Sequence, residues 1–133
     1  MKLKEFNSQN SSFIKTGEPT ISCNVKAGLM NLSAELCKSM KLEADDRVSV
    51  LQDEDTPQDW YLAASKEGFK LRKDRDDKSG NTALSFNNTI TVKAIAKSLG
   101  IESNYFKCRV GDEPVILGKG KYFPIITKSV NIR

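Results

Sequence analysis

The sequence predicts a mostly β protein with two short helices (an α+β fold), built from duplicated β-β-α-β-β units that form one barrel. Three observations support this prediction. Many short stretches alternate apolar and polar residues, each half of the chain has one stretch with apolar residues three or four apart, and the two halves resemble each other at a shift of 59 residues. Alternation is typical of half-buried strands, and the wider spacing is typical of an amphipathic helix.

The first unit has the order strand, turn, strand, helix, strand, loop, strand. Its strands are predicted at 21–25, 29–32, 48–50 and 60–64. The turn before the second strand ends at Gly28. Ser33 is a good N-cap, because its hydroxyl can accept a hydrogen bond from an unsatisfied backbone N–H, and the helix after it ends before Asp45. The acidic stretch 52–59 is expected to be a solvated hairpin tip, and either Trp60 or Tyr61 is expected to face outward.

The second unit repeats this order. Its strands are predicted at 69–72, 84–86, 106–110 and 122–127, and its helix at 92–99. A polar loop at 73–81 replaces the tight turn of the first unit. Asn87 and Asn88 are expected to form a turn, Gly100 suits the position just past a helix end, and further turns are predicted at 111–114 and 118–121.

The internal repeat is clearest at the two helices. Residues 36–43 align with residues 95–102, with Lys, Ser and Glu identical at matched positions. The apolar positions correspond, and they predict the core residues Leu36, Met40, Leu42, Val48, Ile95, Leu99, Ile101 and Phe106. We divide the chain into a flexible arm at 1–18, a first barrel repeat at 19–67 and a second at 68–133, the two repeats forming one compact domain.

The composition argues against an enzyme. The chain has no histidine, which removes histidine bases, Ser-His and Cys-His nucleophiles and every metal site that contains histidine. Three widely spaced cysteines predict neither a disulfide framework nor a zinc site, so no metal, cofactor or catalytic residue is expected. No apolar run approaches the roughly 18 residues of a membrane-spanning helix, and no signal peptide is visible. We therefore expect a cytoplasmic protein without membrane contact.

The charge is unevenly distributed. Residues 1–67 contain 8 basic and 11 acidic residues, whereas residues 68–133 contain 13 basic and 6 acidic residues. This asymmetry indicates an anionic partner for the second half or a polar dimer contact, although a plain solvated surface is an alternative. The candidate phosphate contacts are, in order, Lys119, Lys121, Lys70, Arg72, Lys107 and Arg109. Lys119 and Lys121 lead because they lie on a glycine-flanked hairpin without local acids.

The stretch from the turn glycine to the third strand resembles the AbrB/MazE/SpoVT family. The matching positions are Gly28, Leu32, Glu35, Leu36, Met40, Leu42, Asp46 and Val48. The second repeat matches through its helix and the residues that follow. The resemblance implies a swapped-hairpin barrel, in which two units interlock around one core. Two units in one chain are similar to the tandem arrangement of MraZ-type proteins, so a monomer with pseudo-twofold symmetry is expected, or a homodimer.

Two functions follow as hypotheses. The first is a non-enzymatic DNA-binding or transcription-regulator-like protein that contacts the phosphates of double-stranded DNA through its basic second half. The alternative is a protein-interaction module, antitoxin-like or an assembly partner, that binds a protein and no nucleic acid. Salt separates the two, because a phosphate-driven complex weakens steeply as salt rises and an apolar protein interface does not.

Overall fold

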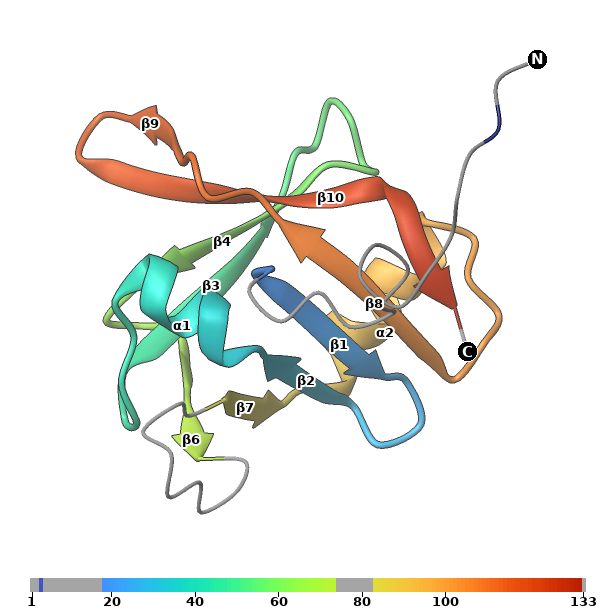
Figure 1. Cartoon of the computed structure of the whole chain (residues 1–133), viewed down its shortest axis with the longest axis horizontal. Coiled ribbons are helices and arrows are strands. Elements are labelled where there is room, and N and C mark those ends of the chain that lie inside the picture. Colours follow the sequence, from blue (N-terminus) through green and yellow to red (C-terminus); the bar gives the residue numbers. More distant parts are fainter. Residues whose placement is uncertain (1–2, 4–17, 74–82, 133) are drawn as a thin grey trace.

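Ten strands and two helices make up the described part of the chain, which is residues 3, 18–73 and 83–132 of the computed structural model (Figure 1). The strands are β1 (Thr20–Asn24), β2 (Leu29–Leu32), β3 (Arg47–Gln52), β4 (Trp60–Ala64), β5 (Phe69–Lys70), β6 (Arg72–Lys73), β7 (Leu84–Asn87), β8 (Tyr105–Val110), β9 (Val115–Leu117) and β10 (Gly120–Ile132). The helices are α1 (Ala34–Met40) and α2 (Thr89–Ser98). The predicted mostly β fold with two short helices is confirmed.

All strand pairs are antiparallel, and their order is β5-β3-β4-β10-β8-β1-β2-β7-β6, with β9 attached to β10 alone. Within the first unit β1 pairs with β2 and β3 with β4, and the second unit repeats this as β6 with β7 and β8 with β10. The first strand of each unit pairs with the third strand of the other, as β1 with β8 and β5 with β3. The units therefore exchange hairpins and interlock, as expected of duplicated units in a swapped-hairpin barrel.

Leu71 closes the barrel. Leu71 lies between β5 and β6, which are the two ends of the strand order. β5 pairs with β3, and β6 pairs with β7. The N–H of Leu71 donates to the carbonyl of Asp46 at 2.8 Å, and its carbonyl accepts from the N–H of Asp45 at 2.9 Å. Its side chain is fully buried. The predicted strand 69–72 is thus one segment that bends at Leu71 to serve both edges.

The two helices end alike, and the equivalent residues are 59 positions apart. Lys41 and Gly100 both adopt a left-handed conformation, with φ of 57° and 67°. After them, the N–H of Leu42 donates to the carbonyl of Cys37 at 2.8 Å, and the N–H of Ile101 donates to Ala96 at 2.9 Å. This is the bonding of a Schellman motif, which satisfies carbonyls at a helix end. The alignment drawn from sequence thus corresponds to equivalent backbone geometry.

The structure corrects several boundaries in the second unit. Helix α2 begins at Thr89 and not at Val92, because the side chain of Asn88 accepts a hydrogen bond from the N–H of Thr91 at 2.9 Å and so acts as the N-cap. Asn87 is the last residue of β7 and Asn88 is the helix cap, so the turn predicted at these two residues is wrong. Strand β9 was not predicted, and β10 extends well beyond 122–127 in both directions. The predicted arm 1–18 and loop 73–81 lie almost entirely outside the described residues.

A single core fills the barrel and takes side chains from both units and both helices. Five of the eight predicted core residues are buried, namely Leu36, Leu42, Val48, Ile95 and Phe106. Met40, Leu99 and Ile101 are partly buried and pack against this core. Trp60 is buried and Tyr61 is more exposed, as the alternation along a strand requires. Neither helix in the described ranges has the length and apolar character needed to cross a bilayer.

Candidate nucleic-acid interface

The outer face of β8 carries a row of one aromatic and two basic side chains. Burial alternates strictly along this strand, because Phe106, Cys108 and Val110 point into the core. Tyr105, Lys107 and Arg109 therefore share the opposite face and are exposed. Successive members of the row are about 7 Å apart along the strand. The row runs along every second residue of the strand. It combines two cations with Tyr105, whose exposed fraction is 49%.

Neutral polar residues flank this row on the neighbouring strand β1. Tyr105 lies opposite Asn24, and the side-chain amide of Asn24 donates to the Tyr105 hydroxyl at 2.9 Å. Lys107 lies opposite Ser22. Strands β1, β2, β7 and β8 contain no aspartate or glutamate. The neighbouring strand β1 thus supplies hydrogen-bonding groups and no carboxylate.

Lys70 and Arg72 lie elsewhere, where the barrel closes. The ammonium of Lys70 is 3.5 Å from the carboxylate of Asp45, and both side chains are well exposed to solvent. The guanidinium of Arg72 donates to the side-chain oxygen of Asn87. Both cations therefore have a partner within the protein, and β1, β2 and β7 separate β6 from β8 in the strand order.

Lys119 and Lys121 lie on the hairpin that β9 and β10 form, and both are exposed, as predicted. Gly118 and Lys119 are the two turn residues between the paired residues Leu117 and Gly120. In Figure 1 this hairpin reaches outward from the barrel. The six predicted contact residues are therefore distributed over three separate places, and Lys107 and Arg109 share the outer face of β8 with the ring of Tyr105. The sequence analysis missed Tyr105 and Asn24, although the alternation along 105–110 already placed Tyr105 beside the two cations.

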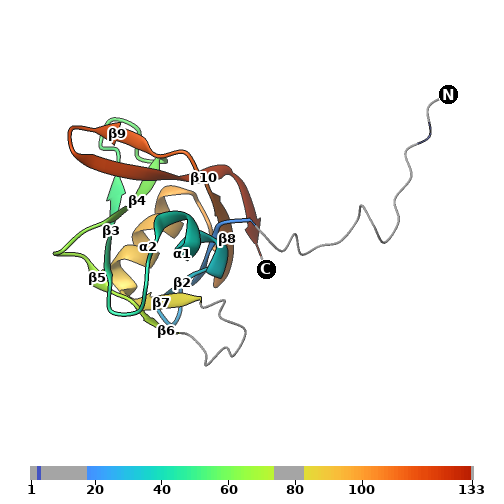
Figure 2. The same cartoon turned by 60° about the vertical axis from the view of Figure 1, so that its left-hand side comes forward.

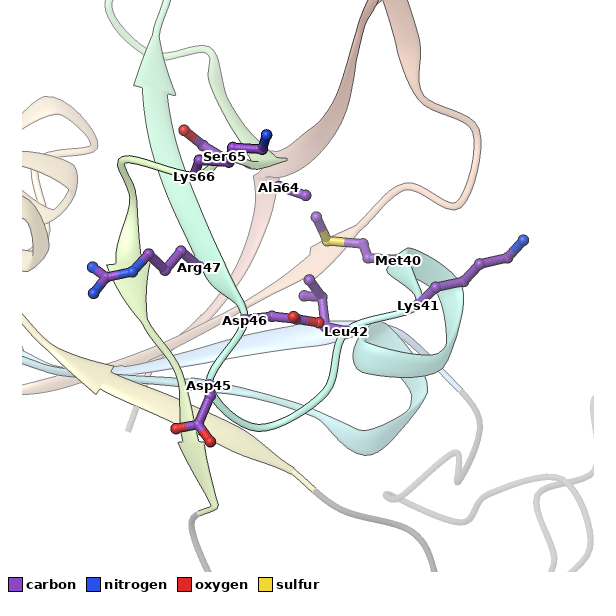
Figure 3. A pocket seen from close by; sticks show the side chains of 9 residues that line it. All are labelled: Met40, Lys41, Leu42, Asp45, Asp46, Arg47, Ala64, Ser65 and Lys66. Carbon is purple, nitrogen blue, oxygen red and sulfur yellow. The ribbon is translucent and has the colours of Figure 1, made fainter.

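A pocket of about 500 Å³ lies between the end of α1 and the end of β4 (Figure 3). Its polar groups already serve the backbone. The carboxylate of Asp46 accepts from the N–H of Glu43 at 2.8 Å, the guanidinium of Arg47 donates to the carbonyl of Gly68 at 3.1 Å, and the hydroxyl of Ser65 accepts from a backbone N–H at 3.3 Å. These contacts hold the chain together as it leaves the helix and the strand, so we assign the pocket no chemistry.

The three cysteines are free thiols in the core. Burial raises the pKa of Cys108 to about 11. Burial, and next the charge of Cys108, raise the pKa of Cys23 still further. Burial also raises the pKa of Cys37, whose thiol lies 3.8 Å from the carbonyl of Leu32. A thiol needs its anion to act as a nucleophile, so these side chains are packing residues. Among the residues that the structure describes, no three His, Cys, Asp or Glu side chains gather in a way that suits a metal ion.

No protein-family model, curated protein or solved structure matches this chain. What the geometry defines is a class of architecture: an antiparallel barrel of two interlocked β-β-α-β-β units, with a basic and aromatic row on the outer face of one central strand.

Proposed function

We propose that this is a non-enzymatic nucleic-acid-binding protein, transcription-regulator-like, that holds phosphates with Lys107 and Arg109 on the outer face of β8. The observation that carries the proposal is the row Tyr105, Lys107 and Arg109, bordered by β1 and β10, whose sequences contain no carboxylate. Phosphate binding needs cations that converge on one face. Lys70 and Arg72 fit this role less well, because they lie on β5 and β6, apart from β8 and from each other's partner strand in the sheet.

Tyr105 adds a second element to the proposed site. Its hydroxyl is anchored by Asn24, while about half of the side chain stays exposed to solvent. A ring that is fixed on a sheet surface offers a stacking platform, and unpaired bases present the faces that stack on it. Phosphate contacts would therefore serve both duplex and single-stranded ligands, and Tyr105 would add affinity for a single strand.

The test is fluorescence anisotropy with a labelled DNA duplex across a salt series from about 50 to 200 mM. Changing both Lys107→Ala and Arg109→Ala should lower the slope of log affinity against log salt by about 1.8, at roughly 0.9 for each phosphate contact. The matched control is Lys119→Ala with Lys121→Ala, which removes the same charge from the hairpin and should leave the slope unchanged. If only the control lowers the slope, the contact surface is the hairpin and not β8.

A single strand of the same base composition tests the role of the ring. Tyr105→Ala should weaken single-strand binding by about 1–3 kcal/mol and duplex binding much less. Tyr105→Phe keeps the ring and should retain most of the affinity. A wild-type protein that binds neither duplex nor single strand at low salt would overturn the proposal.

The protein-interaction module is the second candidate, and one observation favours it. Val115, Ile116 and Leu117 form a strand whose side chains are all exposed. Exposed apolar patches of this kind mark protein contacts. Binding through such a strand would change little between low and high salt, which separates it from phosphate contact.

A further inference from the structure

Strand β9 is an exposed apolar edge. It pairs with β10 alone, and the exposed fractions of its side chains are 43% for Val115, 66% for Ile116 and 65% for Leu117. The hairpin that carries it projects from the barrel in both views (Figures 1 and 2). An unprotected edge of this kind is a template for a further strand, and proteins usually guard it with charge or with a covering segment. Within the described residues, β9 has neither.

The hairpin is built to hold this edge in place. Gly118 has a φ of +61°, which suits the first position of a two-residue hairpin turn. A Cβ atom on Gly120 would lie 2.8 Å from the hydroxyl oxygen of Tyr122, so the ring covers that glycine. The β-branched residues Val115 and Ile116 favour the extended backbone. The turn and the β-branched residues therefore favour an extended strand at this edge.

Two copies of this hairpin placed antiparallel would match in charge and in apolar character. Asp112 and Glu113 precede the three aliphatic residues, and Lys119 follows them. In an antiparallel pair centred on Ile116, each Ile116 faces its counterpart and each Val115 faces Leu117 of the second copy. The same register brings Glu113, just before the strand, near the turn that carries Lys119 of the second copy, and does so twice. A parallel pair would instead place like charges side by side, which is unfavourable.

The backbone fits the same register. Leu117 and Gly120 close a two-residue hairpin, and the closing pair of such a hairpin exchanges its hydrogen bonds. Because hydrogen-bonding direction alternates along a strand, the N–H and C=O of Ile116 point to the free edge. Two copies centred on Ile116 would thus exchange two backbone hydrogen bonds at the twofold axis.

We propose that β9 is a self-association strand, through which two copies of the chain pair antiparallel about a twofold axis at Ile116, with Glu113 of each copy contacting Lys119 of the other. The contact is short, and it falls below the roughly 1,200 Å² buried by stable complexes. The dimer is therefore weak, and it forms as the protein concentration rises. It does not involve the β8 row, so its failure would leave the proposed nucleic-acid site untouched.

Sedimentation equilibrium of the full chain without nucleic acid, from micromolar to millimolar concentration, tests the proposal. The mass should rise from 14.8 kDa toward twice that value. Ile116→Lys should weaken the dimer at least about tenfold, since it places two charges against each other at the axis. Ile116→Thr, a milder change, should weaken it in the same direction. Circular dichroism should show unchanged melting for both, because the side chain lies outside the core. A chain that stays monomeric throughout, or an Ile116→Lys variant that dimerises normally, would overturn the proposal.

Charge reversal tests the register. Glu113→Lys and Lys119→Glu should each weaken the dimer several-fold, because each creates two like-charge contacts, and the double variant should restore wild-type affinity. The control is Lys121→Glu, which makes the same charge change on the hairpin but faces no acid in this register, and which should leave dimerisation unchanged. If the double variant is as weak as the two single variants combined, the antiparallel arrangement is wrong.

Discussion

The indole N–H of Trp60 donates a hydrogen bond of 2.8 Å to the hydroxyl of Ser98, and Ser98 in turn donates to the carbonyl of Ile95 at 2.8 Å. Trp60 belongs to β4 of the first unit and Ser98 to α2 of the second. The bond therefore ties the two units together at the edge of the shared core. Ser39 occupies the equivalent position in α1, and its side chain makes no hydrogen bond within the described part of the chain, so the two units differ here.

Ser98→Ala should destabilise the protein by about 1–3 kcal/mol, because it leaves the donor of Trp60 buried without a partner. Urea unfolding followed by fluorescence measures this directly, since Trp60 is the single tryptophan. Ser39→Ala is the matched control at the equivalent helix position, and it should change stability by no more than a few tenths of a kcal/mol. Equal effects at the two positions would show that the bond does not contribute.

Gly28→Ala should cost more than Gly100→Ala, although both residues are left-handed, with φ of 66° and 67°. At Gly100 a Cβ atom meets nothing within 4 Å, so we expect only the conformational cost of about 1 kcal/mol. At Gly28 it would lie 2.3 Å from the hydroxyl oxygen and 2.7 Å from the Cα atom of Thr89, which adds roughly 1–3 kcal/mol of overpacking.

A second-site variant sharpens the Gly28 comparison. Thr89→Ala removes the hydroxyl but not the Cα atom. When Thr89→Ala is combined with Gly28→Ala, the double variant should therefore recover only part of the stability lost in Gly28→Ala. Thermal melting of the four variants and the wild type provides the measurement. Similar losses for Gly28→Ala and Gly100→Ala would mean that the turn and the start of α2 move apart at little cost.

Leu36→Ala and Ile95→Ala should each destabilise the protein by roughly 2–5 kcal/mol, because both side chains are fully buried at equivalent positions of the two helices. Ile90→Ala is the control on α2, where the side chain is 81% exposed, and it should change stability by less than about 0.5 kcal/mol. Chemical denaturation checks all three. An unchanged midpoint for both buried variants would contradict the common core.

The stability of the protein should fall as the pH rises above about 9. The unfolded Cys108 thiol ionises near its ordinary pKa of 9.0, whereas burial raises the pKa in the folded protein to about 11. The contribution is fully present below pH 9 and is lost between 9 and 11, because the unfolded chain then releases a proton that the folded chain retains. The loss from this group reaches at most about 3 kcal/mol once the pH has passed 11, at roughly 1.4 kcal/mol for each pKa unit.

Comparison with Cys108→Ala isolates the contribution of this thiol from that of every other group in the protein. Unfolding free energies at pH 8 and pH 10.5 should fall more steeply in the wild type than in the variant. A colorimetric thiol reagent at pH 8 gives a second check, because all three cysteines should react only after unfolding. Rapid reaction of the folded protein would contradict their placement in the core.

Much of the fold is local and could be predicted from the sequence. Alternation located the strands, Ser33 and Gly100 marked helix ends through their capping chemistry, and the shift of 59 residues identified equivalent helix ends. The start of α2 was missed because Asn88 suits a turn and an N-cap equally well, and only the hydrogen bond to Thr91 decides between them. Strand β9 was missed because three residues are too few to show a period.

The candidate site depended on both the sequence and the tertiary structure. The sequence determined that Lys107 and Arg109 share one face of a strand, because side chains alternate with a period of two. It could not determine that Asp45 partners Lys70, or that β9 and β10 carry Lys119 away from β8, because these contacts join distant segments. The exchange of hairpins, the closure at Leu71 and the bond from Trp60 to Ser98 were likewise decided only by the tertiary structure. Local backbone chemistry specifies each element, whereas the pairing of elements follows from burying one core between two units that cannot each enclose it alone.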